Sequence, residues 1–154
     1  MIPIEHIHPM LVHFPIVLFM SVLALDFIIV ASGRDLADHG PLAGLALVIL
    51  WLGVAAAAAT AFFGDAALDV AAGRGFPQAA LERHEGLGWT TLLVFAGIAA
   101  LRLLAWWRRI PVRGGRGWLA ASVTLAGVAV LVLTAYRGGE LVYQLGVNVA
   151  AIKP

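Results

Sequence analysis

The sequence predicts an all-α integral membrane protein: a four-helix up-down bundle, with a short interfacial segment between helices two and three and a short C-terminal tail. Of the 154 residues, 62% are hydrophobic and only 12% are charged, whereas soluble domains carry roughly 25% charged residues. Four apolar runs are each long enough to cross a hydrocarbon core of about 30 Å as a helix. Because lipid offers no partner for backbone N–H and C=O groups, each span must satisfy its own, as a helix does.

The four runs form a single membrane domain over residues 1–154, with predicted spans at about 9–32, 41–64, 86–107 and 117–136. The connections 33–40 and 108–116 are short, which makes successive helices antiparallel neighbours. The longer connection 65–85 ends in residues 77–83, which we expect to form a short helix at the membrane interface. The tail is too short and too rich in glycine to span again. No internal repeat stands out.

The arginines of the third connection predict the orientation. Arg108, Arg109, Arg113 and Arg116 form a cluster with no acidic residue among them. Short loops rich in Lys and Arg stay in the cytoplasm, so we expect both termini and the 65–85 connection on the outer face. No Lys or Arg precedes the first apolar run, so we interpret it as a retained helix and not as a cleaved signal peptide.

Composition excludes several classes of function. The chain has no cysteine, which excludes disulfides, thiolate metal sites, iron–sulfur clusters and covalently attached c-type haem. The net charge of +1 gives no case for nucleic acid. There is no nucleophile–base arrangement and no phosphate-binding loop, so an enzyme is the least favoured class of function.

The first span begins among histidines and prolines. Pro9 suits the first turn of a helix, whereas Pro15 removes a backbone hydrogen bond within the span and predicts a kink beside His13. His8 and His13 are separated by about 140° around a helix, so each would work with a partner from another helix. His13 lies inside the apolar run, where an unpaired polar group is costly, so a partner or ligand is favoured.

The third span opens at His84 and runs in the same direction as the first. Counted from the two entry points, His8 and His84 lie level, and His13 lies about 6–8 Å deeper at 1.5 Å per residue. The same count places Asp26 and Arg102 level toward the cytoplasmic side. They could form an ion pair that offsets the cost of burying either charge in lipid, or each could reach the headgroups separately.

The outer ends of spans two and four carry further polar residues. Asp65 could bind a cation, orient a histidine or face water. Gly138 and Gly139 suit the end of a helix. Arg137 could pair with Glu140 or hold a carboxylate or propionate, and Tyr143 is typical of the aromatic belt at the headgroup level.

Motifs spread over essentially the whole chain indicate a known family. They are His8-Pro9-x-x-Val12-His13-Phe14-Pro15, Gly64-Asp65, His84-x-x-Leu87-Gly88 and Gly139-x-Leu141-Val142-Tyr143-x-x-Gly146-Val147. At these residues the chain resembles DUF2231, a family of small bacterial membrane proteins without an assigned function. Asn148 departs from the pattern, because a second glycine is expected there.

The resemblance implies a four-helix domain of the bacterial cytoplasmic (inner) membrane. Members of the family are sometimes fused to Rieske-type or c-type cytochrome modules, which points toward electron transfer by association only. This chain carries no such module, so a redox partner is expected to be a separate cytochrome c or iron–sulfur protein, alongside the lipid bilayer. The resemblance leaves the oligomeric state open.

Three hypotheses follow for the outer end. The first is a non-covalent b-type haem, with a cofactor site drawn from His8, His13, His84, Arg137 and Tyr143. The second is a zinc or copper site made of His8, His13, His84 and Asp65. The third is a structural or assembly subunit with no cofactor, whose polar residues hold helix ends together.

Overall fold

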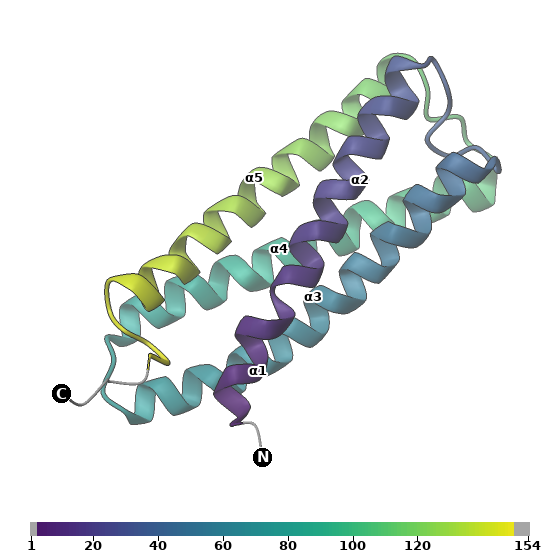
Figure 1. The fold of residues 1–154 in the computed structure, drawn as a ribbon. Coiled ribbons are helices and arrows are strands. Elements are labelled where there is room, and N and C mark those ends of the chain that lie inside the picture. The colour runs from purple at the N-terminus through teal and green to yellow at the C-terminus, as the bar shows by residue number, and fades with distance from the viewer. Residues whose placement is uncertain (1–2, 150–154) are drawn as a thin grey trace.

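The computed structural model describes residues 3–149, and within that range the chain is helical with no strand. The helices are α1 (Ile4–Leu11), α2 (His13–Ala31), α3 (Pro41–Gly73), α4 (Gln78–Arg108) and α5 (Gly115–Tyr143) (Figure 1). The four membrane-spanning segments are Glu5–Ala31, Pro41–Gly73, Gln78–Arg108 and Gly115–Tyr143, with mean hydropathies of 1.8 to 2.5. The predicted all-α four-helix membrane bundle is confirmed.

Each long helix has two neighbours. α2 packs against α3 and α5, and α4 packs against the same two helices. Among the described residues, the backbones of α2 and α4 are not in contact, and neither are those of α3 and α5. α2 and α4 therefore lie diagonally across the bundle. α1 directly precedes α2 in the chain and packs on α3.

Helix ends differ from the predicted spans. α3 runs to Gly73 and α4 begins at Gln78, so the expected interfacial helix over residues 77–83 is wrong: most of that segment is the first turns of α4. At 1.5 Å per residue, the 33 residues of α3 extend about 50 Å, well past the hydrocarbon core. Likewise α5 continues through Gly138 and Gly139 to Tyr143, so the predicted end of the helix at the glycine pair is also wrong.

The helix is interrupted at Val12, beside His13, where the sequence predicts a kink, but Pro9 is not at a helix start. α1 ends at Leu11 and α2 begins at His13, where the missing N–H of Pro15 weakens the helix. Pro9 lies inside α1, so the carbonyl of Glu5 has no helical N–H partner. The side-chain Nδ2 of Asn148 donates to that carbonyl at 3.2 Å, which ties α1 to the turn that follows α5.

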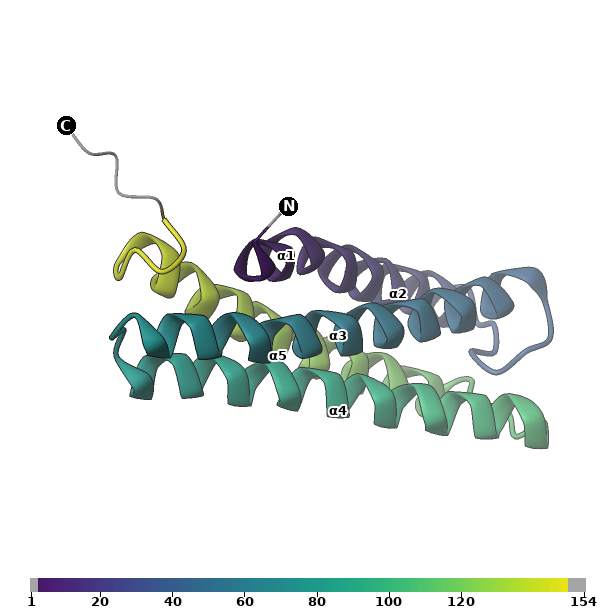
Figure 2. The ribbon, with the colours of Figure 1, turned by 90° about the horizontal axis from the view of Figure 1, so that it is seen from below.

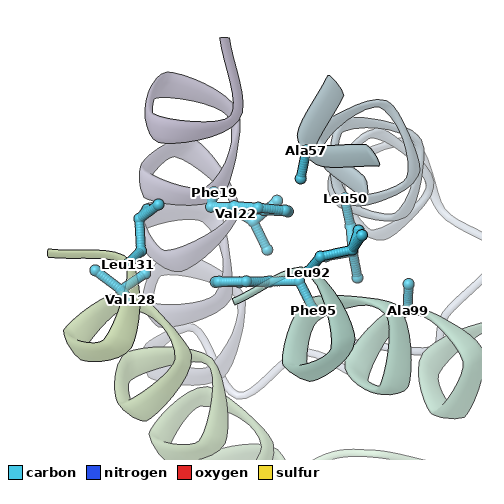
Figure 3. Packing of buried hydrophobic residues seen from close by; sticks show 9 residues of the cluster. All are labelled: Phe19, Val22, Leu50, Ala57, Leu92, Phe95, Ala99, Val128 and Leu131. Carbon is cyan, nitrogen blue, oxygen red and sulfur yellow. The ribbon is translucent and has the colours of Figure 1, made fainter. Parts of the chain in front are cut away.

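The core lies along the middle of the bundle, and all four long helices contribute to it (Figure 3). Phe19 of α2 and Phe95 of α4 are fully buried and stack across the diagonal, with ring centroids 3.6 Å apart and an interplanar angle of 5°. The space for Phe19 comes from Gly53 of α3, where a Cβ would lie 2.6 Å from the ring.

A buried ion pair crosses the same diagonal farther along the bundle. Arg102 donates to both carboxylate oxygens of Asp26, at 2.7 and 2.6 Å. Thr124 of α5 adds a third hydrogen bond to that carboxylate at 2.8 Å. The sequence left open whether these two charges pair or reach the headgroups separately, and the structure has the ion pair.

The two ends of the bundle have different chemistry. The end that holds α1, the α3–α4 turn and the end of α5 is here called the histidine end, because His8 and His84 lie there. The opposite end holds the α2–α3 and α4–α5 connections, with the cluster of arginines, and is called the arginine end. Figures 1 and 2 agree that the start of α1 and the end of α5 lie at the histidine end.

Candidate functional site

A cavity of about 410 Å³ occupies the histidine end and is lined by residues of all five helices and of the turn after α5. Its volume is within the range of small-molecule and cofactor sites, about 300–1,000 Å³. The wall is chiefly apolar. The side chains on it that carry chemistry are His8, His13, Asp65, His84, Glu85, Trp89, Tyr143 and Asn148.

His8 and His84 are held in the same way. Nδ1 of His8 donates to the backbone carbonyl of Thr60 at 2.9 Å, and Nδ1 of His84 donates to the carbonyl of Thr134 at 3.2 Å. A carbonyl oxygen has no proton to give, so each Nδ1 carries the hydrogen. In a neutral imidazole Nε2 is then the unprotonated nitrogen, with a lone pair available to a ligand.

The two rings approach each other across the bundle. Their centroids are 6.0 Å apart and their planes are nearly perpendicular, at 82°. His8 belongs to α1, which leads into α2, and His84 belongs to α4. The pair therefore spans the diagonal between α2 and α4. The prediction that these two histidines lie level is confirmed by their proximity.

Glycine provides the space that both rings occupy. A Cβ on Gly64 would lie 3.0 Å from Nδ1 of His8, and a Cβ on Gly138 would lie 2.9 Å from Cε1 of His84. Each ring therefore lies against the backbone of the neighbouring helix. Gly138 was expected to end a helix, but here it makes room for a ring within one.

The other predicted site residues are placed less centrally. His13 lines the cavity but is exposed, and Asp65 lines it half-buried. Tyr143 lies on the wall and is 90% exposed, as at a cavity mouth. Arg137 does not line the cavity; it donates to Glu140 at 2.8 Å. The structure thus brings together His8 and His84 of the predicted set, with His13, Asp65 and Tyr143 around them.

Some residues of the site are not identified by their side-chain chemistry in the sequence. The carbonyls of Thr60 and Thr134 act through the backbone, so no side-chain chemistry marks them. A signal was nevertheless available: Thr-Ala-x-x-Gly occurs twice, at residues 60–64 and 134–138. Asn148 also lines the cavity, and its Oδ1 is buried without a hydrogen-bond partner.

The donor set is limited to the histidine pair. Within residues 3–149, no three His, Cys, Asp or Glu side chains lie close enough together to hold a metal ion. The expected grouping of His8, His13, His84 and Asp65 is therefore not assembled in this structure. The two histidines whose rings approach each other are His8 and His84.

Sequence comparison connects the chain with one family of membrane proteins. The model of the family described as "Predicted membrane protein (DUF2231)" matches residues 5–151. No curated protein and no solved structure gave a significant match.

Proposed function

The chain belongs to the DUF2231 family of membrane proteins, and we propose that it binds one non-covalent b-type haem between His8 and His84. The haem would make the protein an electron-transfer subunit of the membrane. The observation that carries this proposal is the pair of imidazoles that cross the bundle diagonal with their Nδ1 hydrogens tied to carbonyls.

The donor count favours haem over zinc or copper. In a haem, four of the iron ligands are porphyrin nitrogens, so the protein supplies only the axial ligands. Two histidines are enough for this. A zinc site takes three or four protein ligands, and the described residues assemble no group of three candidate ligands. Two histidines with fixed Nδ1 hydrogens are a complete axial set but an incomplete zinc site.

The spacing of the rings also fits. Two imidazoles on opposite sides of one metal ion, at metal–nitrogen distances of about 2.0–2.1 Å, have ring centres about 6 Å apart. The centroids of His8 and His84 are 6.0 Å apart. Their Nδ1–H bonds to carbonyls are the kind of outer contact that fixes ring orientation and raises ligand basicity.

The cavity wall leaves room for a flat ring. Gly88 and Gly139 line the cavity, and a Cβ at Gly88 would meet nothing within 4 Å, while one at Gly139 would meet only Tyr143 at 3.9 Å. The apolar wall suits a macrocycle. Neither Lys nor Arg lies on the described wall, so the propionates would extend through the mouth into water, and Arg137 is not proposed as their clamp.

We place the histidine end on the outer face of the bacterial cytoplasmic membrane, with the arginine end in the cytoplasm. The support is the cluster of arginines in and beside the connection between α4 and α5, because short loops rich in Lys and Arg stay in the cytoplasm. A separate cytochrome c or iron–sulfur protein would then reach the haem from outside.

A visible difference spectrum tests the haem. The full-length protein, purified in detergent from haem-replete cells, is expected to show a sharp reduced-minus-oxidised α-band, with stoichiometric iron by elemental analysis. His8→Ala and His84→Ala should each lose the band, because each opens one axial position. His39→Ala, at the arginine end, should keep it.

Two results would overturn the proposal. One is wild-type protein that contains neither pigment nor iron. The other is an α-band that survives in His84→Ala but is lost in His13→Ala, which would show that His13 and not His84 is a ligand. Stoichiometric zinc or copper in a colourless protein would select the metal-ion alternative.

A further inference from the structure

We infer that the site consists of two equivalent half-sites, in which a Thr-x-x-x-Gly segment of one helix positions the histidine of its hairpin partner. The haem assignment rests on the proposed function, whereas the positioning geometry does not. Half-site one comprises His8, Thr60 and Gly64; half-site two comprises His84, Thr134 and Gly138.

The first support is a constant interval along the chain. Three side-chain pairs cross the bundle diagonal, and in each the two members are 76 residues apart. These pairs are His8 with His84, Phe19 with Phe95, and Asp26 with Arg102. These three contacts share one interval and are spread from one end of the bundle toward the other. A single approximate two-fold axis therefore relates α1 and α2 to α4.

The second support is a matching interval between α3 and α5. Thr60 and Thr134 are 74 residues apart, as are Gly64 and Gly138. The same interval relates Gly53-Val54-Ala55 to Gly127-Val128-Ala129, whose glycines lie against Phe19 and Phe95 respectively. The helix neighbours are also consistent: α2 with α3 corresponds to α4 with α5. An internal repeat is therefore present that sequence inspection alone did not reveal.

The third support is the hydrogen bonding inside each half-site. The hydroxyls of Thr60 and Thr134 both bond back one turn, to the carbonyls of Ala56 at 2.8 Å and Val130 at 2.9 Å. Each threonine carbonyl accepts from a histidine Nδ1, which a carbonyl with two lone pairs can do alongside its helical bond.

The glycine lies one turn after that carbonyl. In a helix the N–H of residue i bonds the carbonyl of residue i−4, so Gly64 is the helical partner of Thr60, and Gly138 of Thr134. The absent side chain opens the side of the helix at the point where the carbonyl is reached. A Cβ there would lie 3.0 Å from the His8 ring or 2.9 Å from the His84 ring, so the ring would have to move and its Nδ1–H bond would lengthen.

Matched alanine substitutions test the positioning role in the full-length protein. Gly64→Ala should displace His8 alone, and Gly138→Ala should displace His84 alone. Loss of an outer contact to a metal ligand typically weakens binding about 10- to 100-fold, so each variant should lose haem affinity by about that factor and change its α-band. Gly97→Ala is the control, because a Cβ there meets nothing within 4 Å.

Nitrogen-15 NMR of the histidine side chains, recorded on protein without haem, provides a readout that is independent of the cofactor. In the wild type, both His8 and His84 should be protonated at Nδ1 and bonded to a carbonyl. The signal of His8 should change in Gly64→Ala and that of His84 in Gly138→Ala, each without the other, while Gly97→Ala changes neither.

The outcomes separate the two proposals. If the wild type binds no haem but the paired NMR changes occur, the proposed function fails and the half-sites stand. If haem binds but Gly64→Ala leaves the His8 signal and the affinity unchanged, the positioning role is overturned. Equal loss of both histidine signals in every variant, with unfolding, would also overturn it.

Discussion

At the scale of single residues, Asn148 joins two features that are far apart in the sequence. It has a φ of +61°, a conformation that glycine adopts freely and asparagine tolerates better than most residues. This explains why it can replace an expected glycine. Its side chain then donates to the carbonyl of Glu5, the one that Pro9 leaves without a helical partner. The sequence showed both departures from the usual pattern, but not that one compensates for the other.

A double-mutant cycle tests this compensation. Asn148→Gly keeps the backbone conformation but removes the donor, whereas Pro9→Ala gives the Glu5 carbonyl an N–H partner within α1. Asn148→Gly should therefore destabilise the wild type more than it destabilises the Pro9→Ala variant, with a coupling of about 0.5–1.5 kcal/mol. Thermal unfolding in detergent measures all four proteins. Equal effects in both backgrounds would show that the hydrogen bond does not compensate for Pro9.

At the scale of elements, the spans were predictable, but their ends were not. Hydropathy marks where a helix leaves lipid, not where it ends, so it predicts a separate interfacial segment where the polar first turns of α4 lie. The effect of neighbouring helices on a helix end was also not predictable from the sequence. Gly138 would be expected to end an isolated helix, yet α5 continues through it, and the ring of His84 lies against it.

The ion pair between Asp26 and Arg102 should hold α2 and α4 together across the diagonal. The side chains of the pair are 0% and 5% exposed, so removing one partner leaves a buried charge, which costs about 3–5 kcal/mol. Asp26→Leu and Arg102→Leu should each lower the thermal unfolding temperature markedly. The double variant should recover much of the loss, since it leaves no charge behind.

Arg108→Leu provides the reference for that experiment, because Arg108 is exposed at the end of α4 and should change stability little. A double variant that is less stable than either single variant would show that the pair contributes through its attraction and not through the cost of breaking it.

Close packing of helices predicts a graded effect of adding one methyl group. At Gly53 a Cβ would lie 2.6 Å from the Phe19 ring, and at Gly127 it would lie 3.2 Å from the Phe95 ring. Overpacking costs about 1–3 kcal/mol, so Gly53→Ala should destabilise the protein most and Gly127→Ala less. Gly97→Ala, on an open face, should be neutral or stabilising by up to about 1 kcal/mol. Any other order in detergent melting experiments would contradict the packing described for the Phe19–Phe95 stack.

At the scale of the whole molecule, the approximate two-fold axis was the feature least visible in the sequence. The matching positions hold opposite charges in the case of Asp26 and Arg102, and His13 matches Trp89. The interval also differs between the two sets of helices, 76 residues in one and 74 in the other, which breaks any single alignment of the halves. Contacts in three dimensions restore the correspondence, because related residues meet at the axis.

The orientation is a prediction for the whole molecule, and the absence of cysteine makes it accessible to a clean experiment. Ala72→Cys places one thiol at the histidine end, and Ser32→Cys places one at the arginine end; both positions are exposed. A membrane-impermeant thiol reagent applied to spheroplasts should label the first and spare the second until the membrane is permeabilised. Labelling in the opposite order would invert the proposed topology.

The stacked phenylalanines at the centre of the bundle also have an electrical consequence. Phe19 and Phe95 are fully buried, with their ring centroids 3.6 Å apart, and along α2 and α4 they lie between the histidine pair and the arginine end. Moving one charge across the full membrane costs about 2.3 kcal/mol per 100 mV, and most of that potential falls across the apolar core. An electron placed between His8 and His84 from the near side would cross little of it. The midpoint potential of the proposed haem would accordingly be nearly insensitive to the membrane voltage, and its electron exchange would take place at one surface of the membrane.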